Sequence, residues 1–140
     1  MAPMDDTEIA ARLRLSATRL HRRLRQEAGS GLSPSQGSAL VAINNNGPLT
    51  LGALAEHERV APPTITKVVA FLEGEGLVER RADPNDKRAA IVRTTKKGQG
   101  LVEESRRRKT QWLVKQIEQL TPEDQERLAA ALPILEALQQ

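Results

Sequence analysis

The sequence predicts a mainly α-helical fold with one small β-hairpin. Most of the 140 residues fall into segments whose apolar side chains recur every three or four positions, and these segments begin at helix-capping residues. Residues 77–94 differ, because they contain two short strand-like runs around a polar tip. With this length and 39% hydrophobic residues, the chain can bury one modest core, so we expect a single domain over residues 1–140.

The first helix is expected over residues 7–27. Asp5 and Asp6 precede it, where negative charge complements the positive end of the helix dipole. The Gly-Ser-Gly run at residues 29–31 ends it. Its apolar side chains share one face at helical spacing: Ile9, Leu13, Ala17, Leu20 and Leu24.

Two shorter helices follow. Ser33 and Gln36 form a capping box with Pro34 in the first helical position, and the helix that they open ends at residues 44–48, Asn-Asn-Asn-Gly-Pro. Thr50 can cap a third, short helix that carries apolar residues at positions 51, 54 and 55.

A fourth helix over residues 61–75 has two distinct faces. Four of its apolar residues follow the i, i+3, i+4, i+7 pattern of a buried face: Ile65, Val68, Val69 and Leu72. A rotation of about 100° per residue places Pro63, Lys67 and Ala70 near the opposite face, with Thr64 and Thr66 on its flanks. This outward face is small and uncharged apart from Lys67.

A β-hairpin is expected next, with strands at residues 77–81 and 89–94. Pro84 and Asn85 supply turn chemistry between them, and Asp83 and Asp86 can bond to nearby backbone. The tip ends in basic residues 87 and 88. A helix followed by a basic-tipped hairpin is the layout of a winged helix-turn-helix, in which the helix enters a DNA groove and the hairpin, the wing, lies beside it.

The C-terminal part should form two helices that take part in a dimer. Thr95 caps a long helix through residue 120, and Thr121 opens a sixth helix, in which Pro133 should cause a kink or a break. Their leucines give more apolar surface than a small lobe can cover, unless they fold back on their own chain. The residues expected at the dimer interface are Leu13, Leu20, Ile117, Leu120, Leu128, Leu132 and Leu135.

Charge is unevenly distributed along the chain, although the net charge is only +3. Residues 59–109 hold 13 basic and 7 acidic side chains, whereas residues 110–140 hold 2 and 5. The positive field therefore lies on the segment expected to bind DNA. A second basic cluster at residues 106–109 can extend the phosphate contacts, pair with acids of a partner chain, or remain solvated.

An ordered set of motifs resembles the MarR family of bacterial regulators (multiple antibiotic resistance regulators). The motifs are residues 49–55 (LTLGALA), 63–67 (PTITK), 72–73 (LE), 76–80 (GLVER) and 83–88 (DPNDKR). The resemblance implies a sequence-specific DNA-binding homodimer, usually a repressor, that reads a pseudo-palindromic site. It also implies a DNA-binding lobe over residues 33–98 and dimerisation helices at residues 5–28 and 99–140.

The residues expected to contact DNA come from the fourth helix and the wing. They are Pro63, Thr64, Thr66, Lys67, Arg81, Lys87 and Arg88, with Asp83 and Asp86 shaping the wing. The minor groove attracts guanidinium groups, so Arg88 is the candidate to enter it, and the resemblance implies the same role. Asp86 can instead orient Arg88 in the free protein. Alternatively, Thr64, Thr66 and Lys67 only face solvent.

The signal is predicted only in outline. The resemblance implies that a small anionic or aromatic compound releases the DNA by binding where the first, second and fifth helices meet, and His21 and Trp112 are the candidate contacts. Because the chain has no cysteine, the thiol-oxidation switch of some relatives is excluded.

Other classes of function fit the sequence less well. Its two histidines, His21 and His57, lie in separate helices, and we find no cysteine, Gly-rich phosphate loop or metal-spaced cluster, so we expect no enzyme, metal or cofactor. No apolar run is long enough to span a membrane, and no signal peptide is recognisable, so a cytoplasmic protein is expected. A winged helix used only to bind other proteins is the remaining alternative.

Overall fold

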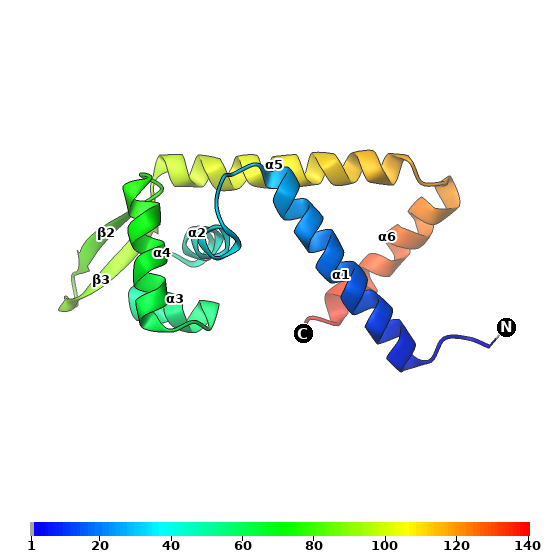
Figure 1. Cartoon of the computed structure of the whole chain (residues 1–140), viewed down its shortest axis with the longest axis horizontal. Helices are drawn as coiled ribbons and strands as arrows, with labels where there is room; N and C mark the ends of the chain where they lie inside the picture. Colours follow the sequence, from blue (N-terminus) through cyan, green and yellow to red (C-terminus); the bar gives the residue numbers. More distant parts are fainter. Residues whose placement is uncertain (1) are drawn as a thin grey trace.

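The computed structural model describes residues 2–140 as six helices and a small sheet (Figure 1). In chain order the elements are α1 (Asp6–Ala28), α2 (Pro34–Asn46), β1 (Leu49–Thr50), α3 (Leu51–Glu58), α4 (Pro62–Gly74), β2 (Val78–Asp83), β3 (Asp86–Thr94), α5 (Lys96–Glu118) and α6 (Pro122–Ala137). Helices α2, α3 and α4 and the sheet form a lobe at one end. The long helix α5 leads from this lobe to the region of α1 and α6.

The helices begin where the capping residues predict. The side chains of Ser33, Thr50, Thr95 and Thr121 each accept a hydrogen bond from the backbone N–H three residues later, at 3.0 to 3.2 Å. Gly29 ends α1 in the left-handed conformation, with φ of 62°, which glycine adopts without steric cost. These helix boundaries depend on contacts between residues that are close in sequence. They can therefore be predicted from the sequence.

The sheet has one strand more than the hairpin that was predicted. Leu49 and Thr50 form β1, which pairs antiparallel with β3 so that Leu49 faces Val92 and Thr50 faces Ile91. The strand order is β1-β3-β2, which places β3 in the centre. Two residues are too short to show an alternating pattern, and their partners lie some 40 positions away, so the sequence pattern could not indicate this strand.

The hairpin is also longer than predicted. Asp83 pairs with Asp86, which leaves Pro84 and Asn85 as the two residues of the turn. The predicted tip residue Arg88 therefore lies on β3 itself. A register irregularity between Ala82 and Asp83 locally distorts the hairpin next to the turn.

The hydrophobic core lies in the lobe. Its largest fully buried side chains come from α2, α3, α4 and β3: Leu40, Ile43, Leu54, Ile65, Val69, Leu72 and Val92. On α4, Ile65, Val69 and Leu72 are buried and Val68 is half-buried, as predicted. This packing directs the opposite face of α4 to solvent.

Helix α6 contributes nothing to this core, since none of its residues is buried. It runs from Pro122 to Ala137 with Pro133 inside it. The predicted alternative of a break at Pro133 is therefore wrong. Proline lacks only one backbone donor, and the helix on both sides of it continues. No helix in residues 2–140 is long and apolar enough to cross a membrane.

Gly98, near the start of α5, is tightly enclosed, because a β-carbon there would overlap the backbone carbonyl oxygen of Leu77. We expect Gly98→Ala to lower the free energy of unfolding by about 2 kcal/mol, since one of two backbone segments must shift. Gly100 on the same helix has open space around it. Gly100→Ala should raise the free energy of unfolding by up to about 1 kcal/mol, because alanine has a higher helix propensity than glycine. Urea unfolding at one protein concentration measures both, and equal effects would contradict the close packing.

Candidate nucleic-acid interface

The outward face of α4 presents the side chains that the sequence predicted. Pro63, Thr64, Thr66 and Lys67 are all exposed. The hydroxyl of Thr66 donates a hydrogen bond of 3.0 Å to the Pro62 carbonyl oxygen, so within the free protein its proton is already used. Lys67 makes no ion pair with any residue of the described chain, 2–140. This face is accessible and carries one uncompensated positive charge.

Side-chain hydrogen bonds shape the wing around its turn. The carboxylate of Asp83 accepts a bond from the Asn85 backbone N–H at 2.9 Å, and that of Asp86 accepts one from the Arg88 backbone N–H at 3.0 Å. These contacts are typical of aspartates that stabilise turns. Asp86 thus bonds to the backbone of Arg88 rather than to its guanidinium group.

Lys87 and Arg88 are the free cations of the wing. Both are exposed, and neither forms an ion pair in the part of the chain that the structure describes. Both side chains are therefore available to a negatively charged partner.

Arg81 differs from these two residues. Its guanidinium lies 3.3 Å from the Glu79 carboxylate, which also bonds to Arg93 on the paired strand. The hydrogen bond from Arg93 is the main cause of a lowered pKa at Glu79; desolvation opposes it, and the charges of Arg93 and Arg81 lower the pKa further. The carboxylate stays ionised at neutral pH, so part of the positive charge of Arg81 is already compensated.

Contacts between elements hold the wing against α4, and no sequence pattern indicated them. Arg80 on β2 lies 3.5 Å from Glu73 near the end of α4. The hydroxyl of Thr95 donates to the Gly76 carbonyl oxygen at 2.6 Å, and the Lys97 ammonium donates to that of Glu75 at 2.8 Å. These bonds tie α4, β2 and the start of α5 together. The base of the wing is therefore fixed relative to the end of α4.

The three arginines of the basic cluster on α5 are bonded within their own chain, whereas Lys109 lines a cavity. Arg106 donates to the Asn45 side-chain oxygen at 2.7 Å, and Arg107 and Arg108 both bond to Glu104 at 2.6 to 3.0 Å. The bond from Arg107 is the main cause of a lowered pKa at Glu104, and Arg108 adds to it. The structure thus gives these arginines partners within the chain rather than a free cationic surface.

The predicted dimer residues lie outside the core. Leu13, Ile117 and Leu135 are half-buried, whereas Leu20, Leu120, Leu128 and Leu132 are exposed. The exposed fraction is 37% for Leu128 and 47% for Leu132. The leucines of α6 therefore do not fold back into a core of their own chain.

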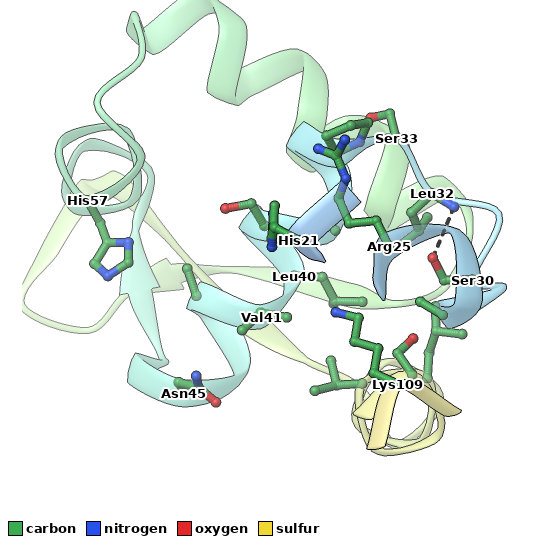
Figure 2. A pocket seen from close by; sticks show the side chains of 18 of the residues that line it. His21, Arg25, Ser30, Leu32, Ser33, Leu40, Val41, Asn45, His57 and Lys109 are labelled. Carbon is green, nitrogen blue, oxygen red and sulfur yellow. Dashed lines mark hydrogen bonds between the residues drawn. The ribbon is translucent and has the colours of Figure 1, made fainter. Parts of the chain in front are cut away.

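A cavity of about 510 Å³ opens between α1, α2 and α5 (Figure 2). His21 lines it, together with Arg25 and Lys109, and Figure 2 shows Lys109 reaching inward from α5. His57 of α3 lines it as well, which the sequence did not indicate because α3 is remote from α1 in the chain. The other lining side chains are small, hydroxylic, amide or aliphatic, and the lining includes no carboxylate from the described residues.

Trp112 does not join His21 in this cavity. It is half-buried on α5, with the guanidinium carbon of Arg23 5.2 Å from its ring centre. This arrangement is a cation–π contact between α5 and α1. The two predicted ligand contacts are therefore in different environments, and only His21 lies at the cavity.

Comparison with known proteins agrees with this architecture. The MarR family model matches residues 32–90. Over 134 residues the chain is 38% identical to the HTH-type transcriptional regulator MT0903.1 of Mycobacterium tuberculosis, covering 95% of this chain and 94% of that protein. It is 39% identical over 131 residues to an uncharacterized HTH-type transcriptional regulator of Mycobacterium leprae, ML2140, covering 93% and 92%.

Solved structures show the same fold. A putative transcriptional regulator from Pseudomonas aeruginosa superposes with a TM-score of 0.86 at 34% identity, over 99% of each chain. A mutant of MepR from S. aureus, bound to an oligodeoxyribonucleotide, superposes with a TM-score of 0.73 at 21% identity, over 94% of this chain and 98% of that one. The motifs, the winged helix-turn-helix lobe and these relatives agree: the chain belongs to the MarR family of HTH-type transcriptional regulators.

Proposed function

We propose that this MarR-family regulator binds a pseudo-palindromic operator as a homodimer, represses transcription there, and leaves the DNA when a small ligand binds. The observation that carries the proposal is the surface formed by the outward face of α4 and the wing. It presents Lys67, Lys87 and Arg88 exposed and without ion pairs among residues 2–140.

The division of roles between α4 and the wing follows from their chemistry. An α-helix fits the major groove, where Thr64, Thr66 and Lys67 can contact phosphates or base edges. The minor groove is narrow and electrostatically negative, which suits the guanidinium of Arg88 at the end of a two-stranded wing. Lys87 and Arg81 contact the phosphates. The contact from Arg81 is weaker because Glu79 already pairs with it. The MepR mutant has the same fold and was solved with a bound oligodeoxyribonucleotide, which supports DNA as the partner of this fold.

The homodimer is supported by the apolar side chains at the other end of the molecule. Helix α6 has no buried residue, and it exposes Leu128 and Leu132 on the same stripe as the half-buried Leu135. Monomeric proteins rarely expose such a row of large apolar side chains. A second copy, packed through α1, α5 and α6 about a two-fold axis, buries it. The resulting dimer presents two α4 helices to two related half-sites.

Release by a ligand is supported by the cavity between α1, α2 and α5. Arg25 and Lys109 give it fixed positive charge, the described lining holds no carboxylate, and Leu40 and Val41 supply aliphatic surface. A small organic anion with an apolar body fits this lining. Because the walls belong to both the lobe and α1, a ligand between them can alter the separation of the two α4 helices. Screening small organic acids for release of the protein from its operator tests this part.

Binding to DNA should depend steeply on salt. The two copies of Lys67, Arg81, Lys87 and Arg88 in a dimer offer enough cations for about six to eight phosphate contacts, so affinity should fall at least about 10³-fold between 50 and 200 mM salt. Fluorescence anisotropy with a duplex selected from a random-sequence library measures this. Binding that does not change with salt, or no binding to any duplex, would instead favour a protein-interaction module.

Genomic footprinting then identifies the regulated genes and the sign of regulation.

A further inference from the structure

Phe71 is the only phenylalanine of the chain, and it is not part of the core. It lies on α4, and 41% of its side chain is exposed. The other large apolar residues of α4 are buried or half-buried, and Phe71 lies on the flank of the face that they form: Ile65, Val68, Val69 and Leu72. The sequence-based assignment of the outward face did not include Phe71.

Helical geometry places Phe71 within the proposed DNA-reading face. It follows Lys67 by four residues and Thr64 by seven, and these spacings put all three side chains on one stripe of the helix. All three are exposed, as are Ala70 and Gly74 beside them. From Thr64 to Phe71 the helix rises about 10 Å, which is within the width of about 12 Å of the major groove.

The chemistry of the ring limits what it can recognise there. A phenyl group has no hydrogen-bond donor or acceptor, so it cannot read guanine, adenine or cytosine edges. The one apolar group that a base presents in the major groove is the C5-methyl of thymine. The other two side chains of the stripe, the Thr64 hydroxyl and the Lys67 ammonium, are polar, so Phe71 is its only apolar contact group. An aromatic ring in this surface is therefore suited to thymine.

We propose that Phe71 is a specificity-determining residue that recognises thymine by packing its ring against a C5-methyl group in each operator half-site. This inference rests on the proposed DNA binding, and it adds the base and the atom that α4 selects. The continuity of Phe71 with Lys67 and Thr64 on one exposed stripe favours DNA over a protein partner, since any partner that covers Phe71 must also cover the lysine and the threonine.

Uracil substitution tests the contact at the level of one methyl group. The probe is a duplex selected from a random-sequence library, in which single thymines are replaced by uracil, a change that removes only the C5-methyl. Burying one such carbon contributes about 0.8 kcal/mol, so wild-type protein should bind about fourfold more weakly for each contacted thymine replaced. Phe71→Ala should bind the thymine duplex correspondingly more weakly and should not distinguish uracil from thymine.

Three further measurements separate this contact from general effects on binding or folding. Lys67→Ala on the same stripe should lower affinity equally for the thymine and uracil duplexes, because it removes a charge and leaves the ring in place. Thermal unfolding should show that Phe71→Ala is folded, as expected for a side chain outside the core. Phe71→Leu should keep part of the discrimination.

The outcomes distinguish the two proposals. If wild-type protein binds the selected duplex but wild type and Phe71→Ala respond equally to uracil at every position, Phe71 does not read thymine and the inference is wrong, while the proposed DNA binding stands. Undiminished affinity of Phe71→Ala for the thymine duplex also overturns it. If wild-type protein binds no duplex, the proposed function itself fails, and this inference fails with it.

Discussion

Replacing Arg88 with alanine is expected to weaken operator binding about 10- to 100-fold at physiological salt. Arg88 is exposed near the end of the wing, and no acidic side chain in residues 2–140 forms an ion pair with it. Its guanidinium is therefore free to enter the minor groove, where one specific arginine contributes about 1–3 kcal/mol. Titration of the selected operator at two salt concentrations measures the loss and the accompanying change in salt dependence.

The matched control is Arg107→Ala. Arg107 is also an exposed arginine, but it lies on α5 and is engaged by Glu104. Its removal lowers the net charge by the same amount and should leave operator affinity within about twofold, because long-range charge effects are screened at physiological salt. Arg88→Lys should recover the charge but only part of the affinity, since ammonium lacks the planar guanidinium shape. Wild-type affinity of Arg88→Ala would show that the minor-groove role is wrong.

A glutamate at Leu128 should abolish the dimer and, with it, most of the operator affinity. Leu128 shares one stripe of α6 with Leu132 and Leu135, and a charge buried opposite a second copy of this stripe has no counter-ion there. Loss of the dimer removes the second half-site from the same binding event, which reduces affinity by about 10² to 10⁴. Sedimentation at several protein concentrations and operator titration measure the two effects.

Ala130→Glu is the control for this substitution. Ala130 is exposed, and it lies about 200° around α6 from Leu128, on the side away from the leucine stripe. The variant adds the same charge to the same helix, so it should remain a dimer and bind the operator like wild type. If Leu128→Glu also sediments as a dimer, the proposed packing through α6 is incorrect.

The locally determined parts of this molecule were predictable. Ser33 and Gln36 form their capping box, and Thr95 and Thr121 cap the two C-terminal helices where expected. The buried side of α4 follows from the spacing of Ile65 and its apolar neighbours. In each case the interacting groups lie within one or two helical turns, so their spacing in the sequence is also their arrangement in space.

The candidate site was predicted only in part. The exposed residues of α4 and the wing follow from the same local spacing, although the residues assigned to the outward face of α4 did not include Phe71. His21 and Trp112 were expected to share one binding site, yet they lie apart, and His57 of α3 lines the cavity instead. Whether two side chains on different helices meet depends on the rotation and offset of those helices, which the spacing within each helix does not specify.

The sequence by itself determined the positions of the six helices, the existence of the basic wing and the membership in the MarR family. Only the tertiary structure decided which charges remain available. It bonds Arg93 to Glu79 across the hairpin and joins Arg106 to Asn45, while Lys67 and Arg88 stay free in the described chain. The physical reason is distance along the chain: capping and turn formation act between near neighbours, whereas the Arg93–Glu79 pair across the hairpin, the Arg106–Asn45 bond, the pairing of β1 and the cavity depend on residues that only the folded chain brings together.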